Sequence, residues 1–84
     1  MELHERVNNI KTKHDLCQFV GALRSELATH PERWENPTLD RFLESMEAWI
    51  EGMESYYKNT GQPPLTRQRG RRFGDILMAA RMYE

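Results

Sequence analysis

Apolar residues recur at intervals of three and four along most of this chain, a spacing that predicts α-helices. The clearest run covers about 37–59, where acidic residues fill the opposite side, and similar runs cover about 12–30 and 67–83. The sequence has neither sustained apolar–polar alternation nor an Asn-Gly or Asp-Gly turn between apolar runs, so it gives little support for strands. The pattern therefore predicts an all-α fold, a compact three-helix bundle forming a single domain over 1–84. The polar stretch 1–11 is expected to be a short N-terminal arm or an extra short helix.

Capping residues suggest where the first two long helices begin. Thr12 has a side-chain oxygen suited to an N-cap, and Asp15 three residues later can bond back to the backbone, as in a capping box. Asn36 precedes Pro37, which suits the first helical position, so Asn36 is expected to cap the middle helix. The third helix is expected to begin between residues 66 and 70.

Large apolar side chains on these three stripes are the candidates for the core. An antiparallel bundle buries the stripes against one another. The expected core residues are Phe19, Leu23, Trp34, Phe42, Met46, Trp49, Ile50, Phe73 and Leu77.

Length and charge exclude several classes of protein. With 84 residues the chain has room for one small core and no deep cofactor cavity. Its formal net charge of −1 argues against a basic footprint over the whole surface. We find no apolar run of about 20 residues and no segment resembling a signal peptide. We therefore expect no membrane contact. Cys17 is the only cysteine, so we expect no internal disulfide, and a free thiol in a chain without a signal segment predicts a cytoplasmic location.

Several short motifs resemble those of a small bacterial domain family of unknown function. The shared pattern begins with a Trp-Glu-Asn segment at residues 34–36 and continues with a Leu-x-x-Phe-Leu motif at 39–43. It then includes Trp-Ile at 49–50 and ends with Ala-Ala-Arg-x-Tyr-Glu at 79–84. The resemblance covers about 15–84. It implies a small, mostly helical fold and no particular chemistry.

Residues capable of catalysis or metal binding do not form a convincing site. His14 and Cys17 are three residues apart, a spacing that permits an activated thiolate, but no third group is placed to orient the histidine. The three histidines, His4, His14 and His30, are scattered and do not form helical zinc pairs. The acidic row on the middle helix is better explained as a solvated face, and comprises Asp40, Glu44, Glu47, Glu51 and Glu54. We therefore expect no enzyme activity, no metal and no cofactor.

The start of the third helix carries a cluster of four arginines, Arg67, Arg69, Arg71 and Arg72. Residues 58–72 contain five positive charges and no acid, whereas residues 32–54 contain seven acids and two arginines. Cations at a helix N-terminus oppose the helix dipole, and guanidinium groups suit carboxylates and phosphates. Four interpretations stay open: internal pairing with the acidic helix, plain solvation, an acidic partner protein, or nucleic acid. The absence of aromatic residues among the arginines disfavours single-stranded nucleic acid.

A second candidate surface consists of Tyr56, Met78 and Met82, which can form an adaptable protein-binding rim or the edge of the core. Taken together, the residues favour a small non-enzymatic protein-interaction or regulatory module whose partner is another protein. The alternative is an anion or nucleic-acid binder acting through Arg67–Arg72. The sequence favours a monomer and does not identify the partner.

Overall fold

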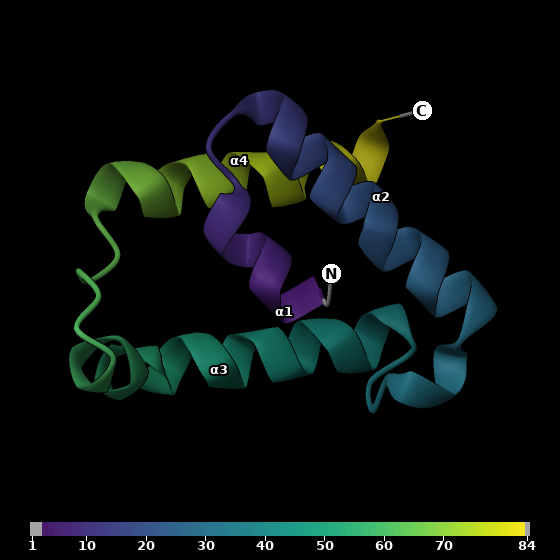
Figure 1. The fold of residues 1–84 in the computed structure, drawn as a ribbon, viewed down its shortest axis with the longest axis horizontal. Helices are drawn as coiled ribbons and strands as arrows, with labels where there is room; N and C mark the ends of the chain where they lie inside the picture. Colours follow the sequence, from purple (N-terminus) through teal and green to yellow (C-terminus); the bar gives the residue numbers. More distant parts are fainter. Residues whose placement is uncertain (1–2, 84) are drawn as a thin grey trace. The chain divides into compact units, whose positions relative to one another are not determined.

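The computed structural model describes residues 3–83, which form helices and connections without any strand (Figure 1). Three long helices are present, which confirms the all-α fold class predicted from the spacing of apolar residues. None of the helices within residues 3–83 is both long enough and apolar enough to cross a membrane. The long helices are α2 (Lys13–Thr29), α3 (Leu39–Asn59) and α4 (Arg67–Met82).

The N-terminal stretch takes the second of the two forms expected for it. Helix α1 (Leu3–Arg6) is followed at once by the 3-10 turn η1 (Val7–Asn9). A second 3-10 turn, η2 (Pro31–Arg33), follows α2. The long helices begin and end within two residues of the expected boundaries. Residues 1, 2 and 84, the ends of the expected single domain, lie outside the described residues.

Helix α2 begins as the capping pattern predicts. Thr12 has extended backbone angles, and its Oγ1 accepts a hydrogen bond from the backbone N–H of Asp15 at 3.1 Å. The Asp15 carboxylate in turn accepts from the backbone N–H of Lys11, also at 3.1 Å. The first bond satisfies a backbone donor of the first helical turn, and the second satisfies the N–H of the residue before the cap. The helix ends at Thr29, one residue before His30 and Pro31, where the proline disfavours further α conformation.

The Asp15 cap makes part of the stability dependent on pH. The hydrogen bond from the Lys11 N–H, helped by the Thr12 hydroxyl, holds the pKa of Asp15 below its ordinary value of 3.8. A carboxyl with a lowered folded-state pKa stabilises the fold above its unfolded pKa, and this stabilisation is lost as pH falls through the folded value. We expect the free energy of unfolding to decrease at pH values below about 4. The Asp15→Asn variant should show a smaller decrease over the same pH range. Urea unfolding at several pH values measures this pH dependence of the free energy of unfolding, and Glu51→Gln is the control. An equal decrease at low pH in the wild type and in Asp15→Asn would contradict the prediction.

Helix α3 begins two residues later than expected, and its cap is Thr38. The backbone N–H of Arg41 donates to Thr38 Oγ1 at 3.3 Å, and Phe42 N–H donates to the Thr38 carbonyl at 2.9 Å. The prediction that Asn36 caps this helix was therefore wrong. Asparagine and threonine both cap well, and the fixed φ of Pro37 suits an extended segment as well as a first helical turn. The segment from Asn36 to Thr38 is therefore compatible with a helix capped by either residue.

Alanine substitutions distinguish Asn36 from Thr38 as the cap of α3. We expect Thr38→Ala to lower the free energy of unfolding by about 1 kcal/mol, because it leaves the Arg41 N–H without its acceptor. Asn36→Ala removes no helix cap and is expected to have the smaller effect. Thermal or urea unfolding of both variants decides between them. A larger loss of unfolding free energy in Asn36→Ala than in Thr38→Ala would show that Asn36 is the cap.

Glycine ends α3 and threonine starts α4. Gly61 has a φ of +72°, and the N–H of Gln62 donates to the Tyr57 carbonyl at 2.8 Å while that of Gly61 donates to Lys58 at 3.3 Å. This pair of bonds is a Schellman motif, in which glycine adopts the left-handed conformation without a Cβ clash. Five residues later, Thr66 Oγ1 accepts from the Arg69 N–H at 3.1 Å and caps α4.

The chain divides into two compact units, Met1–Ser45 and Met46–Glu84, with the division inside the continuous helix α3. No residue described by the structure is fully buried. Of the nine expected core residues, four are half-buried: Phe19, Leu23, Trp34 and Met46. The other five keep 38–50% of their surface exposed, namely Phe42, Trp49, Ile50, Phe73 and Leu77. The membership of these five residues in the core stays a prediction.

Candidate protein-binding surface

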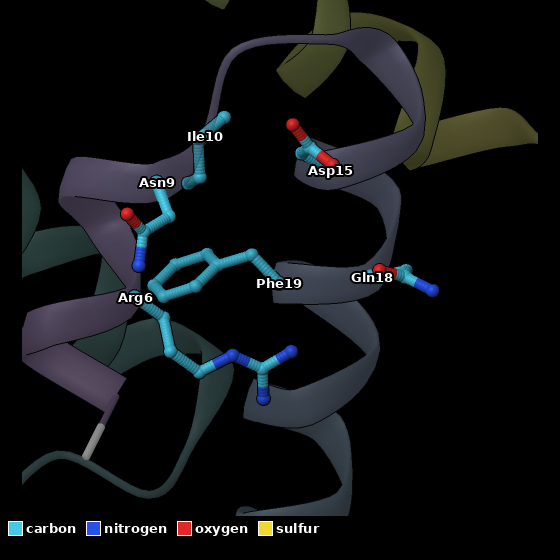
Figure 2. Close-up of a pocket in the computed structure, with 6 residues that line it drawn as sticks. All are labelled: Arg6, Asn9, Ile10, Asp15, Gln18 and Phe19. Atoms are coloured by element: carbon cyan, nitrogen blue, oxygen red, sulfur yellow. The ribbon is translucent and has the colours of Figure 1, made fainter. Parts of the chain in front are cut away.

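The N-terminal segment partly covers one aromatic residue of α2. Figure 2 shows the Phe19 ring pointing from α2 towards Arg6 and Asn9, with Ile10 above it. The hollow at this place has a volume of about 100 Å³, far below the several hundred Å³ of ordinary ligand sites. This region is therefore a packing contact that leaves Phe19 half-buried, and it offers no room for an organic substrate.

Trp34 joins the turn η2 to two helices in the first unit. Its indole Nε1–H donates to Glu26 Oε1 at 2.9 Å, and its ring centroid lies 5.9 Å from that of Phe42. The same indole lines an apolar hollow of about 300 Å³ together with Leu23 and Leu27 of α2. A buried or half-buried tryptophan normally finds a partner for its N–H, and Glu26 supplies it here. We interpret Trp34 as the main structural anchor of this unit.

The residues considered for catalysis stay apart or exposed. Cys17 is an exposed free thiol, and among the described residues it makes no hydrogen bond with His14. No group of three or more His, Cys, Asp or Glu residues gathers within the searched residues 3–83. His30 instead pairs with Glu32, its Nδ1 lying 3.2 Å from a carboxylate oxygen.

An apolar groove between α3 and the start of α4 is the most distinctive surface of the second unit. Its volume is about 310 Å³. Trp49 and Phe73 border it and remain 50% and 45% exposed. Side chains of this size left half-exposed favour contact with another apolar surface. The full lining is Met46, Trp49, Ile50, Met53, Tyr57, Leu65, Arg69 and Phe73, which we call the α3–α4 groove.

The connector between these helices forms one wall of the groove. Leu65, which follows Pro63 and Pro64, packs towards α4 over Gly70, where an added Cβ would lie 3.4 Å from Leu65 Cδ2. An added Cβ at that distance would make an ordinary van der Waals contact, so Leu65 packs on Gly70 without requiring a glycine there. The two prolines restrict the backbone of the connector, which helps to hold Leu65 in place.

All four arginines of the cluster lie in the first two turns of α4 and are exposed. Among residues 3 and 5–83, the only ion pair closer than 4 Å is His30–Glu32, so none of the four has a carboxylate partner there. The first turn of α4 also contains no acidic residue. Arg69 is placed differently from the others, because it lines the α3–α4 groove, the hollow around the prolines and a third hollow with Arg72.

Of the three residues of the expected rim, Tyr56 lies on α3, Met78 and Met82 lie on α4, and all three are exposed. Tyr56 lies beside the groove, with its ring centroid 5.2 Å from that of Trp49 in an edge-to-face arrangement. Met78 and Met82 are exposed, at 60% and 74%, but do not line the groove. Sequence reasoning missed the role of Leu65, because an isolated leucine after two prolines belongs to no helical stripe.

The comparisons with known proteins give one result. A family model described as a family of unknown function (DUF7660) matches residues 12–84. No curated protein and no solved structure matches the chain.

Proposed function

The chain belongs to this family of unknown function, and from that premise we propose that it is a non-enzymatic protein-interaction module. Its binding surface would be the α3–α4 groove together with Arg69 and Arg72 at the edge. The partner would be another protein that inserts apolar side chains into the groove and places carboxylates near the arginines.

The observation that carries this proposal is the composition of the groove. Tryptophan, tyrosine, phenylalanine, methionine and arginine are the residue types enriched at protein interfaces. The lining contains all five types: Trp49, Tyr57, Phe73, two methionines and Arg69. Central tryptophan and arginine side chains also contribute most of the binding energy in many interfaces.

The same lining supports binding in preference to chemistry. It contains no carboxylate, thiol or imidazole, which are the groups that most often transfer protons or attack substrates. A volume of about 310 Å³ is near the lower end for a small-molecule site, and the groove is bordered by exposed side chains. A protein side chain or helix face suits this shape.

Site-specific photo-crosslinking tests the proposal. A benzophenone amino acid at Phe73 is expected to form an adduct with another protein in cells that express the chain. The same group at Glu51, on the acidic side of α3, is the matched control and is expected to give little adduct. Equal labelling from both positions, or none from Phe73, would contradict the proposal.

A second candidate function rests on the arginines alone. The four guanidinium groups are exposed, have no carboxylate partner within 4 Å in the described part of the chain, and lie at a helix start that carries no acid. These features favour an anion such as a nucleic-acid phosphate. Binding of that kind weakens steeply as salt rises, because each neutralised phosphate releases counterions. Binding to a labelled oligonucleotide at several salt concentrations distinguishes the two functions. A cytoplasmic location stays part of the proposal and rests on the single unpaired thiol of Cys17.

A further inference from the structure

We draw no further inference here: the strongest candidate, the apolar hollow of about 300 Å³ beside Trp34 between α2 and the start of α3, is an open surface of the first unit, and nothing in the structure shows what covers it.

Discussion

Trp34→Ala is expected to destabilise the protein by about 3 kcal/mol, a large part of the roughly 5 kcal/mol available to a small domain. The substitution removes the ring that contacts Phe42 and the N–H that donates to Glu26 at 2.9 Å. It also enlarges an apolar hollow that is already about 300 Å³. Urea unfolding followed by circular dichroism measures the change.

Trp34→Phe separates the hydrogen bond from the packing. Phenylalanine keeps most of the apolar contact but has no N–H for the Glu26 carboxylate, so we expect a loss nearer 1–2 kcal/mol. Glu26→Gln keeps an acceptor oxygen and should cost less than Trp34→Ala. An unfolding midpoint for Trp34→Ala equal to that of the wild type would show that Trp34 does not anchor the first unit.

Trp49→Ala is expected to have its largest effect on binding. Trp49 borders the α3–α4 groove and keeps half of its surface exposed, so its burial by a partner can contribute about 2 kcal/mol or more. That corresponds to a loss of roughly 30-fold in affinity. The loss is measured as a fall in the yield of adduct from a crosslinker at Phe73.

Met82→Ala is the matched control for Trp49→Ala. Met82 is apolar and 74% exposed but does not line the groove, so we expect it to leave binding unchanged. The stability of Trp49→Ala carries separate information. Half-burial of an indole corresponds to about 2 kcal/mol, whereas full burial in a core corresponds to 3–5 kcal/mol. If Trp49→Ala lowers the free energy of unfolding by about 3–5 kcal/mol and leaves binding unchanged, Trp49 lies in a core and has no role in the interface.

The helices could be predicted from the sequence because their determinants are local. Apolar residues three and four positions apart define each stripe, and caps act over the same short distance, as Thr12 does with Asp15. The end of α3 is local in the same way, since Gly61 adopts the positive φ that glycine tolerates. The start of α3 was missed because two good caps, Asn36 and Thr38, flank one proline, and propensity does not choose between them.

The candidate surface was predicted only in part. The arginine cluster stood out as a run of charge, and its exposure follows from its position at a helix start. The groove did not stand out, because Trp49 and Phe73 have the same spacing as ordinary core residues. No sequence pattern marks Leu65 as a groove residue. Its place in the groove wall is known only from its position beside Gly70 in the structure.

By itself, the sequence determined that this chain forms three long helices, where their ends lie to within two residues, and which residues carry charge. These features depend on interactions between neighbours three or four positions apart, so a linear pattern contains them. Only the tertiary structure decided that Arg69 borders an aromatic groove and that Trp34 bonds to Glu26, eight residues away. Those contacts depend on the directions in which the connectors turn the helices, and apolar spacing does not specify these directions.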